Sequence, residues 1–268
     1  MSPASDSTIS VRLDPANPGQ FFACCGLLEL ANRLWRGAEA WFDSSAFYLR
    51  PAMRVERPVR IGDLVRVIAG AALEPIDPAN ETSSPILMGT PFNLRLDWWE
   101  DERAGGHQLK VWAGSMRGFR IARAMQTVLA SEEEAQTSSL LDYGTVVRDP
   151  DQPDNKVEPF YFDGRRGASA LPIDIGFSPD SLQMTNIAYP AVEFLCLVGL
   201  QRFRPVATAN RRVFEYRTWS LPLTAMIAPV AVAGLIADSG ASAFRFESAF
   251  RTDQRKHKAF NMATPIRR

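Results

Sequence analysis

The sequence predicts an α+β fold in which mixed, mostly antiparallel strands pack on two central apolar helices. The first observation behind this prediction is a pair of strongly apolar segments with helical character, residues 19–35 and 189–203. The second is a series of short alternating segments, among them 8–13 and 211–219, which are rich in β-branched and aromatic residues. A chain of 268 residues with 46% hydrophobic and 22% charged residues can bury a sizeable core.

The two apolar segments share a short pattern. Asn17 and Pro18 favour a helix start before the first segment, and Pro205 ends the second. Both segments, FFACCGLL (21–28) and FLCLVGLQ (194–201), have a phenylalanine, a glycine five residues later and then a leucine. The pattern is compatible with two similarly packed halves and equally with an accidental match between apolar helices.

The remaining elements are shorter. Helical periodicity predicts further helices over 61–72 and 116–130. Residues 40–50 predict one or two strands. Residues 92–99 and 108–112 alternate, and the intervening EDERAGG predicts that they form a hairpin with an acidic tip.

Charge divides the chain into two unlike parts. Residues 1–154 contain 15 basic and 21 acidic side chains, whereas residues 155–268 contain 15 basic and 9 acidic ones. We predict an acidic N-terminal half (1–148), a linker or surface loop (149–158) and a basic C-terminal half (159–268), with one continuous domain as the alternative. The basic half is compatible with a nucleic-acid-binding face.

The cysteines and the apolar stretches predict a cytoplasmic protein. Cys24, Cys25 and Cys196 lie in apolar helical patterns without zinc-site spacing, so we expect buried thiols in a reducing compartment. The N-terminal residues do not resemble a secretion signal. The most apolar stretch, 221–237, contains two prolines and is short for a membrane span, which favours a core segment.

Motifs of catalysis are not evident in the sequence. His107 and His257 lie in separate loop-like segments without metal-ligand spacing, and phosphate-binding glycine motifs are missing. Asp163 and Asp174 lie 11 residues apart and are candidates to share a metal ion, although aspartates in such loops more often cap turns. We therefore expect a protein without cofactor, metal or catalytic activity, with a metal-dependent nuclease as the alternative.

Arginine makes up 26 of the 30 basic residues. It suits bidentate phosphate contacts and stacking on bases, although a genome rich in G and C would also favour it. The candidates for nucleic-acid contact, most of them in the basic half, are Arg165 and Arg166; Arg202 and Arg204; Arg211, Arg212 and Arg217 with Tyr216; Arg255, Lys256 and Lys258; and, on one helix face, Arg117, Arg120 and Arg123.

Each candidate has a simpler explanation. Arg202 and Arg204 follow a helix C-terminus, where the helix dipole favours cations. The aromatic residues between Arg211 and Trp219 would suit a core, and the basic residues near the C-terminus would suit a solvated tail.

Three blocks of sequence resemble a known family. LDPANPGQFFACCGLLELANRLW (13–35), PFYFDGRRGASALPIDIGFSPDS (159–181) and YPAVEFLCLVGLQRFRP (189–205) resemble the b-series subunit of type I-G (formerly I-U) CRISPR systems. That family is regarded as a variant of the large subunit of the effector complex, Cascade. The blocks cover about a quarter of the chain.

The resemblance implies a non-catalytic subunit of an RNA-guided surveillance complex in antiviral defence. Its expected partners are CRISPR RNA, target DNA and the other effector subunits. In such complexes base pairing reads the sequence, while protein contacts the backbone and a short motif. One rival is a backbone-type subunit that grips guide RNA, with a ferredoxin-like core and a thumb at 74–88 or 149–158. Another is a scaffold that contacts only protein.

Overall fold

The structure, a computed structural model, describes residues 9–52, 59–80, 82–103, 105–114, 116–131, 140–166, 187–251, 255 and 257–266. These residues form an α+β fold, as the sequence predicts. Every pair of neighbouring strands in this part of the chain is antiparallel.

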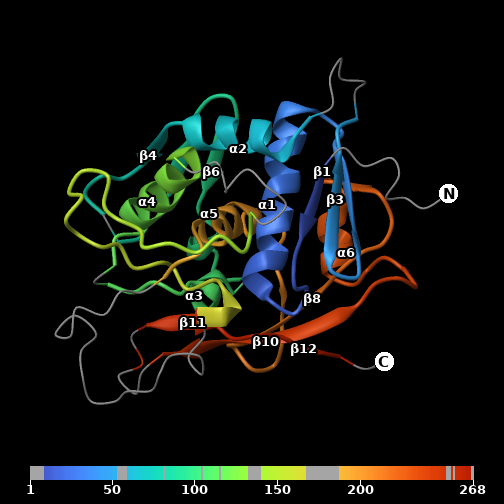
Figure 1. Cartoon of the computed structure of the whole chain (residues 1–268). Coiled ribbons are helices and arrows are strands. Elements are labelled where there is room, and N and C mark those ends of the chain that lie inside the picture. Colours follow the sequence, from blue (N-terminus) through green and yellow to red (C-terminus); the bar gives the residue numbers. More distant parts are fainter. Residues whose placement is uncertain are drawn as a thin grey trace.

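Two apolar helices lie side by side in the middle of the molecule. They are α1 (Pro18–Leu34) and α5 (Pro190–Gly199), and Figure 1 shows α1 running through the centre with α5 beside it. Both agree with the predicted segments to within a few residues. The other helical elements are α2 (Ile61–Gly70), α3 (Gly106–Leu109), α4 (Gly118–Ser131) and α6 (Ala228–Val232), with 3₁₀ turns η2 (Trp98–Glu100) and η4 (Gly164–Arg166).

The crossing of α1 and α5 depends on two glycines. A Cβ atom at Gly26 would lie 2.1 Å from the carbonyl oxygen of Leu195, and one at Gly199 would lie 2.0 Å from that of Phe22. Real Cβ atoms do not approach backbone oxygens so closely, so only glycine permits this contact. The glycine that recurs in the two apolar segments is therefore the residue through which the two helices touch.

The described strands form three antiparallel sheets. They are β1 (Ile9–Arg12), β2 (Glu39–Asp43), β3 (Ala46–Arg50), β4 (Leu73–Pro75), β5 (Ile86–Met88), β6 (Leu94–Leu96), β7 (Val206–Ala207), β8 (Val213–Arg217), β9 (Leu223–Thr224), β10 (Ala243–Phe250), β11 (Lys258–Phe260) and β12 (Thr264–Pro265). One sheet has the order β1-β3-β2-β9, a second the order β11-β10-β8-β7 with β12 also on β10, and a third the order β4-β5-β6. Figure 1 shows the first sheet beside α1 and the long strand β10 below it.

Aromatic side chains join α1 to both larger sheets. The ring of Phe21 stacks on Phe42 of β2 at 5.1 Å between centroids and on Tyr216 of β8 at 4.4 Å. The indole of Trp219 donates a 2.7 Å hydrogen bond to the carbonyl of Ala40. Strand β9 also pairs with β2, so the first sheet contains strands from both sides of residues 149–158. The division of the chain at that loop stays a prediction.

The predicted hairpin of 92–99 and 108–112 is wrong. Strand β6 pairs with β5, and Gly106–Leu109 forms helix α3. Gly105 adopts a φ of 72°, and a Cβ at Gly106 would lie 2.1 Å from the carbonyl oxygen of Trp98. The paired glycines thus begin a helix packed tightly on η2 rather than closing a hairpin turn, and sequence spacing alone does not distinguish these uses of glycine.

The helix crossing yields the first testable expectation. Gly26→Ala and Gly199→Ala should each lower the free energy of unfolding by about 1–3 kcal/mol or more, because the new methyl group overlaps backbone atoms of the facing helix. Gly70→Ala in α2 is the matched control, since a Cβ there has no neighbour within 4 Å. It should leave stability unchanged or raise it by up to about 1 kcal/mol. Equal losses in all three variants, measured by chemical denaturation, would contradict this account of the crossing.

Candidate nucleic-acid interface

A buried network of polar side chains ties the predicted loop around Asp163 to both central helices. Asn17 caps α1, as predicted, by accepting hydrogen bonds from the amides of Gly19 and Gln20 at 3.1 and 3.4 Å. The same oxygen accepts from the amide of Gly164 at 2.9 Å. The Nδ2 group of Asn17 donates to Asp163 Oδ1 at 2.8 Å. One asparagine therefore begins a helix and holds a segment distant in sequence against it.

Glu193 supports the same loop from α5. Its fully buried carboxyl group accepts from the amides of Phe162 and Asp163, each at 3.2 Å. Burial, and secondarily the charge of Asp163, raises the pKa of Glu193 to about 8. The loop is thus anchored by a carboxyl group that holds its proton at neutral pH.

Asp163 is fully committed to structural contacts. Besides Asn17, both of its oxygens accept from the guanidinium of Arg165, at distances of 2.6 to 3.2 Å. The second carboxylate of the nuclease alternative, Asp174, lies outside the described residues. Within the described part of the chain, no group of three or more His, Cys, Asp or Glu side chains is placed to hold a metal ion.

Arg165 lies in this network rather than on an open surface. Its guanidinium also donates to Asp142 at 2.9 Å and to the carbonyl of Leu141 at 2.7 Å, and it lies 3.5 Å from the centre of the Tyr189 ring. These contacts leave little of the group for a phosphate. The backbone of Arg166 belongs to η4, whereas its side chain lies outside the described part.

Arg202 and Arg204 also have acidic partners. Arg202 pairs at 2.5 Å with Glu29, a buried carboxylate of α1 that Arg33 contacts at 2.8 Å. Arg204 pairs with Asp101 at 2.6 Å. Both cations therefore join the end of α5 to other parts of the fold.

Strand β8 sends its aromatic residues into the core. Tyr216 is fully buried, and its hydroxyl donates to the carbonyl of Pro15 at 2.7 Å. Its ring is inaccessible to a nucleic-acid base in this structure. Tyr216 therefore occupies a core position, where the predicted stacking on bases is not possible. Arg217 packs over Gly234, where a Cβ would lie 2.5 Å from Arg217 Nε.

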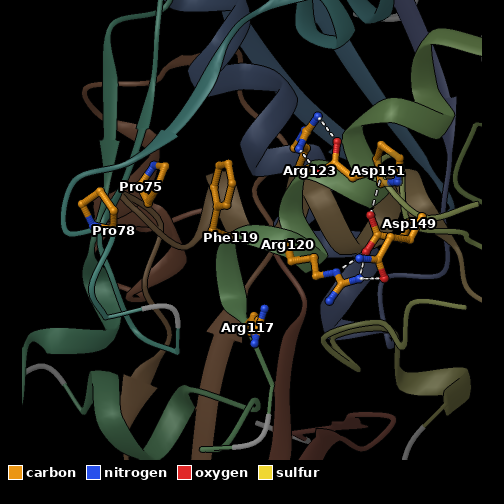
Figure 2. A pocket seen from close by; sticks show the side chains of 10 residues that line it. Pro75, Pro78, Arg117, Phe119, Arg120, Arg123, Asp149 and Asp151 are labelled. Atoms are coloured by element: carbon orange, nitrogen blue, oxygen red, sulfur yellow. Dashed lines mark hydrogen bonds and ion pairs between the residues drawn. The ribbon is translucent and has the colours of Figure 1, made fainter. Parts of the chain in front are cut away.

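The arginine face of α4 is covered by the acidic loop that the sequence marks as a linker. Arg120 pairs with Asp149, and Arg123 makes two contacts of 2.6 and 2.9 Å with Asp151. Figure 2 shows these pairs along one wall of a cavity of about 380 Å³, in which Arg117 is also labelled. Arg120 and Arg123 are thus neutralised within the chain.

Four of the predicted residues come together in a different place. Arg211, Arg212, Arg255 and Lys258 line a groove of about 610 Å³, while Lys256 lies outside the described residues. The other residues that line it are His107, Gln108, Lys110, Trp112, Ala113, Gly114, Asn210 and Phe250. We call this the basic groove. None of the described residues that line it is acidic.

The groove is assembled where α3 meets the second sheet. Lys258 lies opposite Phe250 in the β10–β11 pair, and the guanidinium of Arg212 lies 4.8 Å from the centre of the Phe250 ring. The Nζ of Lys258 donates to the carbonyls of His107 and Gln108 at 2.9 and 2.7 Å. Figure 1 shows α3 adjacent to β11.

Crowded positive charge is the main electrostatic property of the basic groove. Burial, followed by the charges of Lys110 and Arg212, lowers the pKa of Lys258 to about 8. Burial also lowers the pKa of Lys110, although Glu100 opposes this effect. Such mutual repulsion is relieved by an anion, so the groove is suited to bind phosphate groups.

Comparisons with protein-family models, curated proteins and solved structures find no match. Among the described helices, none has the length and apolar character needed to cross a membrane. The geometry of the basic groove is therefore the main guide to function.

Sequence reasoning missed the groove residues that come from the acidic half. His107, Lys110 and Trp112 lie about 100 residues or more before the other cations, and they were expected in or beside a hairpin. No local signal links them to Lys258. Only the packing of α3 on β11 brings these segments together.

The buried carboxyl group of Glu193 gives a pH-dependent prediction. Between the usual pKa of 4.5 and about 8 the unfolded chain loses this proton while the folded chain retains it. The free energy of unfolding should therefore fall as pH rises across this window, by on the order of a few kcal/mol.

Glu193→Gln carries no such charge and is the comparison. Denaturant titrations should give similar stabilities for the two proteins near pH 5 and a flatter pH dependence for the variant up to pH 8. Parallel pH profiles would show that Glu193 ionises in the folded state as it does in the unfolded chain.

Proposed function

We propose that this chain is a non-catalytic subunit of a type I-G CRISPR RNA-guided surveillance complex, and that it contacts guide RNA or target DNA through the basic groove. The convergence of Arg211, Arg212, Arg255 and Lys258 on one concave surface carries the proposal. The complex would act in the cytoplasm in antiviral defence, together with the other effector subunits.

The sequence resemblance supports the assignment to this complex. Two of the three similar blocks contain α1 and α5, and the described part of the third contains the loop that Asn17 and Glu193 hold in place. The resemblance therefore covers the two central helices and the loop that is hydrogen-bonded to them.

Charge pairing supports the choice of surface. Arg165, Arg202 and Arg204 all have carboxylate partners within 3 Å. In the groove, Arg212 pairs with Glu247 at 3.3 Å, and such a partly exposed pair contributes little to stability. The exposed side chains of Arg211 and Arg255 lie at the same groove. A phosphate backbone can use at least cost those cations that make no close ion pair within the described part of the chain.

The alternatives have less support. The nuclease alternative needs Asp163 as a metal ligand, and its oxygens are occupied by Arg165 and Asn17. Of the two thumb candidates, residues 74–88 include the paired strands β4 and β5, and residues 149–151 are held on α4 by ion pairs. We therefore favour a binding subunit over an enzyme and over a backbone subunit with a thumb.

Binding of the purified chain to labelled single-stranded RNA and to a DNA duplex, measured across a salt series, tests this proposal. The logarithm of the binding constant should fall linearly with the logarithm of the salt concentration, because cations of the groove release counterions from phosphates. Replacing Arg211 and Arg212 together by Gln should weaken binding several-fold. The double substitution should also reduce the magnitude of the slope of this salt dependence by about one for each phosphate that is no longer neutralised.

Arg66→Gln is the matched control. Arg66 is an exposed arginine of α2 paired with Asp63 at 3.2 Å, and it does not line the groove. This variant should bind as the natural chain does. If the double variant in the groove and the control bind equally, the scaffold alternative replaces the groove assignment. If the reconstituted effector complex binds its target equally well without this chain, the assignment to the complex is wrong.

A further inference from the structure

The cations of the basic groove lie at two depths. Arg211 and Arg255 are exposed, whereas Lys110, Arg212 and Lys258 are partly buried; we call the exposed part of the groove its rim and the partly buried part its floor. Lys258 is fixed there by two backbone carbonyls, at 2.9 and 2.7 Å from its Nζ. An ammonium group has three N–H donors, so two such contacts leave a further donor for a ligand.

The aromatic rings of the groove are already covered by cations. Lys110 Nζ lies 5.0 Å from the centre of the Trp112 ring, and the guanidinium of Arg212 lies 4.8 Å from that of Phe250. The indole of Trp112 also donates to the carbonyl of Thr82 at 2.7 Å, which fixes the ring. A base cannot stack on these faces unless the cations leave them. The groove therefore presents charge to a ligand rather than open rings.

The shape of the groove selects between forms of nucleic acid. A duplex is a stiff rod with a persistence length of about 150 base pairs, so its phosphates can reach the rim of a concave surface but not follow it inward. A single strand has a flexible backbone that can place a phosphate at the floor. The arginine face of α4 offers no comparable site, since Arg120 and Arg123 are neutralised by Asp149 and Asp151 (Figure 2).

We infer that the basic groove binds single-stranded nucleic acid with one backbone phosphate held at its floor by Lys258 and Lys110, without reading the base sequence. This inference rests on the proposed function and specifies which form of nucleic acid the groove takes. RNA and DNA single strands share the phosphate chemistry, so either can be the natural ligand.

The test is a binding titration of the intact chain with single-stranded RNA, single-stranded DNA and a duplex of the same sequence. At least one single strand should bind several-fold more tightly than the duplex. Scrambling the sequence of that strand should change its affinity by less than about twofold.

Lys258→Gln keeps a donor for the α3 carbonyls but removes the charge, so it should weaken single-strand binding at pH 7 and leave duplex binding nearly unchanged. Lys156→Gln, an exposed lysine that does not line the groove, should have no effect.

A pH series gives a second readout. The titratable and charged groups that line the groove with Lys258 are His107, Lys110, Arg211, Arg212 and Arg255, while Glu100 lies near Lys110 and Glu247 pairs with Arg212. Of the cations that line the groove, Lys258 is the one whose pKa burial lowers to a value between 7 and 9. Because the pKa of Lys258 is about 8, single-strand affinity should fall by about three- to tenfold over this range. Lys258→Arg should bind at pH 7 and lose less affinity at pH 9.

The outcomes separate the two proposals. Salt-dependent binding with equal affinities for single strand and duplex, unaffected by Lys258→Gln, would overturn the inference and leave the proposed function standing. Binding of no nucleic acid at low salt would overturn both. Thermal melting of the two Lys258 variants verifies that a loss of binding is not a loss of fold.

Discussion

The contact between α1 and α5 is the constraint on which the rest of the structure depends. At Gly26 and Gly199 the two helices are so close that no side chain fits between their backbones. This proximity brings Phe21 within stacking distance of rings from both larger sheets and places Glu193 beside the loop at Phe162 and Asp163. A larger distance between α1 and α5 would break these contacts. The aromatic packing and the hydrogen bonds of Glu193 therefore both depend on the same two glycines.

Charge in this protein serves two different purposes. Buried carboxylates act as attachment points: Glu29 receives Arg202 and Arg33, and Asp163 receives Arg165. These pairs join segments more than a hundred residues apart or fix a loop, and breaking one would leave a buried charge without a partner. The basic groove is different because it gathers cations without a lining carboxylate among the described residues: burial first, and then the charges of Lys110 and Arg212, lower the pKa of Lys258. Repulsion between such cations lowers stability, and a bound anion would relieve it.

The local pattern of the chain was sufficient to predict several elements. The apolar segments became α1 and α5, and Asn17 caps α1 because an asparagine before a proline and an apolar run satisfies the first helical amides. The hairpin expected around EDERAGG was wrong, because Gly105 adopts a positive φ before α3 and Gly106 makes a close backbone contact with Trp98. The sequence groups the arginines by their positions along the chain. This grouping does not reveal which carboxylate each arginine pairs with in the folded protein.

The sequence by itself determined the fold class, the central helices and the excess of cations in the second half, because these depend on periodicity, capping and composition. Tertiary structure alone decided which cations are available. Arg165, Arg202 and Arg204 were drawn into ion pairs, while Lys110 from the acidic half joined Arg212 and Lys258 in one groove. The physical reason is that such a groove is made by the packing of distant segments, here α3 against β11, and no local interaction specifies that contact.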